Sequence, residues 1–190
     1  MKKLLALFLA LMMCLSFTAC KDKDTDTGTD TVVASHLSDS ELELELRFLI
    51  ESNLDCYFLF YVAPLNHTTQ QNSDGYYGTD GSFLSTYAAL EDLVYSTYAK
   101  DKAEDLMNYP SEQEPLYKDS NGNIFVKPDV ITPVDYNILW EDDYTITFTD
   151  RTDKNCSFVL NTVDLDGNAY ETEGSAVIEN NRWLLEDLIY

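Results

Sequence analysis

The order of two patterns constrains the fold most: helical spacing comes first along the chain, and short strand-like segments follow it. Ser38 and Glu41 have the spacing of a capping box, in which each residue satisfies a backbone N–H at a helix start. Apolar residues then recur at helical spacing and predict a helix from about Asp39 to Val62, ended by Pro64. Glu41–Leu46 also alternates like a strand, but the cap and the length favour the helix. Its expected buried face comprises Leu42, Leu46, Leu49, Ile50, Leu54, Tyr57, Phe58 and Tyr61.

Two further helices are predicted before the strand-like part begins. One runs from about Phe83 to Tyr98, and a short one runs from Asp101 to Met107. The segment Asn66–Gly81 between the first two helices is polar and contains glycine, so it is predicted to be a loop.

The rest of the chain has strand chemistry. Asn121-Gly122 stands between Leu116–Lys118 and Ile124–Val126 and predicts a hairpin. Helices followed by strands favour an α+β fold, with N-terminal helices packed on a C-terminal antiparallel meander sheet. Further strands are expected at Asp135–Trp140, Tyr144–Thr149, Cys156–Val163, Ala169–Ile178 and Arg182–Tyr190.

The N-terminus has the pattern of a secretory signal peptide over residues 1–19. Two lysines precede an apolar run from Leu4 to about Leu15, which is shorter than the roughly 20 residues that a membrane-spanning helix needs. The tetrapeptide Phe17–Cys20 resembles the lipobox of bacterial lipoproteins, with Phe17 where leucine is usual. This resemblance implies that Cys20 carries a lipid anchor on the outer face of the cell membrane. The alternative is an ordinary signal peptide in which Cys20 is incidental.

Residues 20–37 are rich in threonine and aspartate and are predicted to form a flexible tether, which leaves 38–190 as a single α+β domain. The net charge of -22 argues against nucleic-acid binding, because phosphate backbones are repelled. Anionic lipids and wall polymers are repelled in the same way, so any electrostatic preference is for basic proteins or cations. A soluble acidic surface without a partner is the alternative.

The four cysteines fall into three groups according to their place in the sequence. Cys14 lies in the signal peptide, and Cys20 is the predicted lipidation site. Cys56 and Cys156 remain as one pair in an exported domain, where oxidation is possible. A disulfide and two buried free thiols are both compatible with the sequence.

The residues that enzymes use are sparse. Only His36 and His67 are present, and no nucleophile-elbow, zinc-spacing or phosphate-loop motif occurs. Asp119–Asn123 mimics the start of an EF-hand loop, but Ile124 stands where glycine is needed and the hairpin explains the same residues. We therefore predict no catalytic residues, no metal and no cofactor.

Tyr76 and Tyr77 lie in the predicted Gly/Asp-containing loop. Tyrosine with polar neighbours is a good contact residue for proteins or sugars, so both are candidate partner-binding residues. The alternative is that they fold back over the core.

Several segments resemble IseA-type DL-endopeptidase inhibitor domains, which are exported domains of Gram-positive bacteria. The stretch Tyr109–Asp129 resembles the short hairpin after the second helical segment of these domains, and Leu90–Val94 with Ala103–Leu106 fits the helical part that precedes it. The closing pair Glu171–Ile178 and Asn180–Leu185 also fits, and it is similar to cystatin-like and NTF2-like lipoproteins as well.

This resemblance implies a protein that performs no reaction and inhibits a cell-wall peptidase of the NlpC/P60 type by binding it. An alternative from a different class is a solute- or sugar-binding envelope lipoprotein, with its ligand in the concave face of the sheet.

Overall fold

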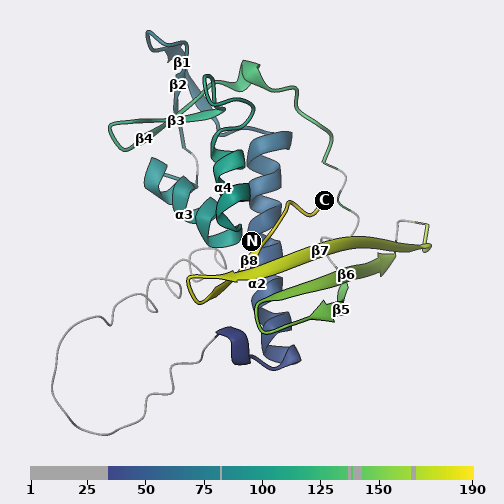
Figure 1. Ribbon diagram of the computed structural model, residues 1–190. Coiled ribbons are helices and arrows are strands. Elements are labelled where there is room, and N and C mark those ends of the chain that lie inside the picture. Colours follow the sequence, from purple (N-terminus) through teal and green to yellow (C-terminus); the bar gives the residue numbers. More distant parts are fainter. Residues whose placement is uncertain (1–33, 82, 137, 139–142, 164–165) are drawn as a thin grey trace, which may run out of the picture. The chain divides into compact units, whose positions relative to one another are not determined.

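The structure is a computed structural model that describes residues 34–81, 83–136, 138, 143–163 and 166–190 (Figure 1). These residues belong to one compact unit, Val32–Tyr190. The predicted signal peptide, Cys20 and most of the predicted tether lie outside the described residues. No described helix is long and apolar enough to cross a membrane.

The first predicted helix is confirmed as α2 (Asp39–Tyr57), which continues into the π-helical turn η2 (Phe58–Val62). Ser38 N–H donates to Glu41 Oε2 at 2.8 Å, and Glu41 N–H donates to Ser38 Oγ at 3.4 Å, so the capping box is formed. The π turn is closed by Ala63 N–H donating to the Phe58 carbonyl, five residues back. Pro64, which has no N–H to donate, follows directly.

The predicted buried face of this helix is wrong at Phe58. Its side chain is 44% exposed, whereas Phe60 is 1% exposed. The buried stripe continues through Asn53, Cys56 and Phe60 at helical spacing. Phe58 lies four residues after half-buried Leu54, at the margin of that stripe.

Two shorter helices cover the core beside α2. Helix α3 (Tyr87–Thr97) starts four residues later than predicted, because Thr86 Oγ1 caps it by accepting a hydrogen bond from Ala89 N–H at 3.2 Å. Helix α4 (Lys100–Met107) agrees with the prediction.

A first antiparallel sheet has the order β1-β2-β4-β3. The predicted hairpin is confirmed, with Asn121 (φ 55°) and Gly122 (φ 83°) both in the left-handed region that a two-residue turn requires. The predicted loop at Asn66–Gly81 is wrong, because it contains two of the strands. The first of them is polar and exposed throughout, so it shows no apolar alternation. The strands are β1 (His67–Gln71), β2 (Tyr77–Thr79), β3 (Tyr117–Ser120) and β4 (Asn123–Val126).

A second sheet is the predicted meander, in the order β5-β6-β7-β8. Its last strand ends at Leu185, so the prediction of a strand up to Tyr190 is wrong for the last five residues. The α+β class is confirmed, with two sheets of four strands instead of one. The strand expected at Asp135–Trp140 is wrong where it can be checked: 135, 136 and 138 form no strand, and the rest lies outside the described residues. The strands are β5 (Thr145–Arg151), β6 (Asn155–Val163), β7 (Ala169–Glu179) and β8 (Arg182–Leu185). Before the sheet, η3 (Pro128–Val130) is a short 3-10 helix.

The chain enters this unit at η1 (Ala34–His36), which is held against the β7–β8 turn. The predicted flexible tether, 20–37, is therefore wrong at 34–36, because hydrogen bonds fold these residues onto the domain. Trp183 Nε1–H donates to the Ala34 carbonyl at 2.9 Å, and Ala34 N–H donates to Asn181 Oδ1 at 3.2 Å. These bonds place the entry point near the start of α2, and η2 lies at the other end of that helix (Figure 1).

Candidate binding surfaces

The two predicted contact tyrosines do not project from a loop. Tyr76 is only 3% exposed, and its hydroxyl donates to the Pro115 carbonyl at 2.8 Å. Tyr77 is half-buried in β2, with its ring centroid 4.5 Å from that of His67. Of the two alternatives, folding back over the core is therefore the one found for Tyr76, and Tyr77 is only partly accessible.

Cys56 and Cys156 are free, buried thiols, so the structure contains no bridge between them. The register pairs Cys156 with Ala176 and Ala176 with Leu185. Cys156 lies on β6, and β7 separates it from β8, the edge strand that contacts the end of α3. Two strand spacings place Cys156 about 10 Å from that edge. Cys56 lies instead beside Thr97 and Tyr98, at the end of α3.

Burial determines the chemistry of both thiols. It raises the pKa of Cys156 to about 11 and raises the pKa of Cys56 further. The thiolate is the reactive form of cysteine, so neither side chain is poised as a nucleophile at neutral pH.

The acidic segment Asp119–Asn123, which resembles the start of an EF-hand loop, forms the turn of the β3–β4 hairpin. Asp119 Oδ1 accepts a hydrogen bond from Gly122 N–H at 2.7 Å, which occupies that oxygen within the turn. In the described part of the chain, no group of three or more His, Cys, Asp or Glu is arranged to hold a metal ion.

A continuous group of aromatic side chains lies around the end of α2, and we call it the aromatic face. Tyr57 is its centre: its ring stacks on Tyr61 at 5.8 Å and on Tyr190 at 5.5 Å between centroids. Tyr136 contacts Tyr57 at 6.2 Å and Phe58 edge-on at 6.1 Å. The aromatic face comprises Tyr57, Phe58, Tyr61, Tyr109, Tyr136 and Tyr190.

Backbone hydrogen bonds hold the segments that form this face. Val134 N–H donates to the Tyr61 carbonyl at 2.9 Å and fixes the segment that carries Tyr136. The Asn53 carboxamide binds the backbone of Ile189 on both sides: Nδ2–H donates to the carbonyl at 2.7 Å, and Oδ1 accepts from N–H at 2.9 Å. That pair fixes the residue immediately before Tyr190.

Much of the aromatic face is open to solvent. Phe58 is 44%, Tyr136 37% and Tyr190 64% exposed, and neighbouring Val134 is also exposed. The other exposed large apolar residues of the described chain are dispersed over separate elements: Leu44, Phe83, Tyr95 and Val163. Dispersed apolar residues are normal on a protein surface, whereas a contiguous apolar patch marks an interaction site.

Carboxylates surround the aromatic face. Burial raises the pKa of Tyr61 to about 12, and the nearby negative charges of Asp187 and Asp105 add to the shift. Desolvation and the charge of Glu51 raise the pKa of Asp55, three residues before Phe58. Lys102 is the cation paired at this edge, with Nζ 2.5 Å from Asp187 Oδ1.

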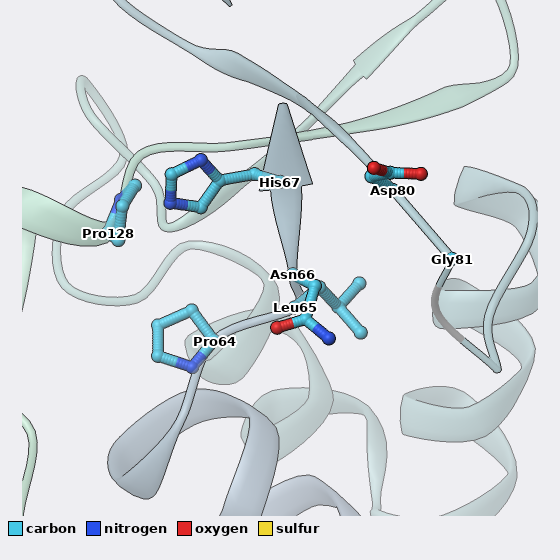
Figure 2. A pocket seen from close by; sticks show the side chains of 7 residues that line it. All are labelled: Pro64, Leu65, Asn66, His67, Asp80, Gly81 and Pro128. Carbon is cyan, nitrogen blue, oxygen red and sulfur yellow. The ribbon is translucent and has the colours of Figure 1, made fainter. Parts of the chain in front are cut away.

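A separate hollow of about 610 Å³ lies at one end of the first sheet (Figure 2). Asn66, His67 and Asp80 give it polar groups, and Figure 2 shows the His67 ring directed toward Pro128, with Asp80 on the opposite side. His67 Nδ1 lies 2.8 Å from the Thr68 carbonyl. All three polar residues are exposed, so water already solvates them.

The sequence reasoning missed the aromatic face, although one signal was present. Residues 57–61 contain four aromatic side chains, and a single helical stripe cannot bury all of them. Tyr109, Tyr136 and Tyr190 come from distant segments, and no local pattern shows that they meet the helix.

Compared with models of known protein families and with curated proteins, the chain matches none. The candidate surfaces therefore rest on the geometry and chemistry of these residues.

Proposed function

We propose that this protein is an extracytoplasmic binding protein that performs no reaction and docks another protein through the aromatic face. The observation that carries the proposal is the contiguous, partly exposed set of rings at the end of α2. Tyrosine and phenylalanine are enriched in protein interfaces, because their rigid rings bury a large area at a small cost in side-chain entropy.

The resemblance to IseA-type domains suggests the target, a cell-wall DL-endopeptidase of the NlpC/P60 type. Inhibition then requires only that the docked protein obstructs access to the peptidase cleft. The low reactivity of the two buried thiols agrees with a role that depends on binding alone.

The position of the aromatic face suits an anchored protein. Tyr57 and Tyr61 lie 18 and 22 residues after Asp39, so at 1.5 Å per residue the face lies roughly 30 Å along the helix from the start of α2, beside which the chain enters. If Cys20 carries the proposed lipid, the protein is attached through the chain that precedes η1, and the aromatic face lies at the other end of α2 from η1.

The direct experiment measures peptidoglycan cleavage by purified NlpC/P60 peptidases with increasing amounts of this protein. We expect inhibition at near-stoichiometric ratios, lost in a double variant Phe58→Ala, Tyr136→Ala. The matched control is Phe83→Ala, because Phe83 is at least as exposed as Phe58 but lies outside the face. A panel of peptidases that is neither bound nor inhibited contradicts the proposed target.

The hollow favours a second candidate function, the binding of a small polar ligand such as a sugar. Its volume lies within the range of about 300 to 1,000 Å³ typical of ligand sites. It lies at the end of the first sheet and not in a concave sheet face. Calorimetric titration with wall-derived glycan fragments tests it: saturable heat that His67→Ala and Asp80→Asn abolish supports this function, and absence of heat contradicts it.

A further inference from the structure

We infer that the surface docked on the aromatic face is cationic, with lysine or arginine side chains seated against the tyrosine rings. The inference rests on the proposed docking through this face and adds the chemistry of the partner. It follows from three features that act in the same direction: the rings, the carboxylates beside them and the charge of the whole chain.

The rings themselves favour a cation. The face of a tyrosine or phenylalanine ring carries negative electrostatic potential, which attracts ammonium and guanidinium groups. The described part of this chain contains four such contacts, among them the Arg47 guanidinium 4.8 Å from the Tyr144 centroid and Lys118 Nζ 5.5 Å from the Tyr76 centroid. Tyr190 is stacked on Tyr57 and is 64% exposed, so much of its ring remains accessible.

Beside the rings, the negative charges of carboxylates outnumber the positive charges of lysine and arginine. Asp55 lies one helical turn before Phe58 and is accessible to solvent, although neighbouring atoms partly desolvate its carboxylate. Within the described chain this carboxylate forms no ion pair or side-chain hydrogen bond. Glu51, one turn earlier on α2, adds a second negative charge. A cation from a partner would neutralise this local repulsion.

Of the eight lysines and arginines in the described residues, six are already paired with carboxylates, and one of these, Lys102, lies beside the aromatic face. Six described ion pairs join lysine or arginine to nearby carboxylates, and the net charge is -22. A second copy of the chain, an anionic lipid surface or an anionic wall polymer would meet repulsion at this face. A basic protein surface would be steered toward it.

The experiment uses the purified protein and three synthetic dodecapeptides, in which arginine, serine or glutamate alternates with leucine. We expect the arginine peptide to bind most tightly and to lose about tenfold or more in affinity between 0.05 and 0.5 M salt, because the Debye length shortens over that range. Binding should weaken at least fivefold in Phe58→Ala and Tyr136→Ala, and severalfold in Asp55→Asn at low salt.

Two controls locate the binding. Phe83→Ala and Asp153→Asn remove an exposed ring and an exposed carboxylate outside the aromatic face and should leave the affinity unchanged. Circular dichroism of every variant shows that the fold is intact, and Asp105→Asn replaces Asp55→Asn if the latter fails this check.

The outcomes separate the two proposals. If the serine peptide binds as tightly as the arginine peptide and still requires Phe58, the docking face stands and the cationic partner is overturned. If the arginine peptide binds Phe58→Ala and Tyr136→Ala as tightly as it binds the unsubstituted protein, it recognises the general negative charge of the chain, and the inference fails. Absence of binding by all three peptides also overturns it, while the peptidase assay judges the proposed function independently.

Discussion

Asn53 connects three parts of the molecule through one buried side chain. Besides binding both backbone groups of Ile189, its Oδ1 accepts a hydrogen bond from the Tyr98 hydroxyl at 2.8 Å. Helix α2, the end of α3 and the C-terminal segment therefore meet at a residue with no exposed surface. Because buried polar groups cost free energy when unpaired, this carboxamide stabilises all three segments together.

Replacing Asn53 by alanine should destabilise the protein by about 3 kcal/mol or more, because it leaves the Ile189 backbone groups and the Tyr98 hydroxyl unpaired in the core. Denaturant unfolding measures the change. The control is Asn108→Ala, which removes one exposed hydrogen bond to the Glu104 carbonyl and should cost less than about 1 kcal/mol. Equal stability of the two variants would contradict this role of Asn53.

The cysteines give a prediction about reactivity. Cys56 and Cys156 are buried, and burial raises the pKa of both thiols. In the native protein both should react with an alkylating reagent far more slowly than after denaturation, and mass spectrometry of non-reduced protein should find both alkylatable. A mass two hydrogens lower, with no alkylation after denaturation, would show a disulfide instead.

Tyr61 gives a prediction about pH. Burial raises its pKa to about 12, above the value near 10 expected in the unfolded chain. Between these two values the unfolded chain releases the proton first, so stability should fall as the pH rises from about 10 to about 12. Unfolding free energies measured across this range should fall less steeply for Tyr61→Phe than for the wild type. An identical slope would show that Tyr61 is not buried as described.

At the scale of elements, two kinds of contact hold the second sheet together. Its β7–β8 turn uses Asn180 (φ 51°) and Asn181 (φ 62°), which adopt the left-handed region more readily than most residues. Within β7, Gly174 is packed under two side chains: an added Cβ would lie 2.6 Å from the Phe158 ring and 2.8 Å from Ile189 Cδ1. The C-terminal segment thus reaches the sheet only because this position has no side chain.

Gly174→Ala should therefore destabilise the protein by about 1 to 3 kcal/mol, through overpacking against Phe158 and Ile189. Gly78→Ala is the matched strand control, because the nearest atom to its added Cβ lies 3.8 Å away, an ordinary contact. Thermal unfolding should show a lower midpoint for the first variant and little change for the second. A neutral Gly174→Ala would mean that the C-terminal segment is not packed on β7.

The elements that could be predicted from the sequence are those with local signals. The Ser38–Glu41 capping box marked α2, and Asn121-Gly122 marked the β3–β4 hairpin. Strand β1 has no such signal, because its residues are all exposed and it becomes a strand only by pairing with β2. The aromatic face is harder still to predict, since it depends on where Tyr136 and Tyr190 are brought by hydrogen bonds to the Tyr61 and Ile189 backbones.

At the scale of the whole molecule, the two ends of α2 carry different structural features. The first end lies beside η1, which is bound to the β7–β8 turn (Figure 1). The other end carries the aromatic face. A protein that docks on the aromatic face, as proposed, would contact the opposite end of α2 from η1.

The central claim, that a protein partner docks on the aromatic face, is tested most directly by site-specific photo-crosslinking in intact cells. A photoreactive phenylalanine analogue is placed at Phe58 in one variant and at Phe83 in another, two positions of similar exposure in different parts of the surface. Adducts are identified by mass spectrometry. We predict a protein adduct from the Phe58 position, with a cell-wall peptidase as the attached chain, and none from the Phe83 position. Equal labelling at the two positions, or no adduct from the Phe58 position, would contradict docking through the aromatic face.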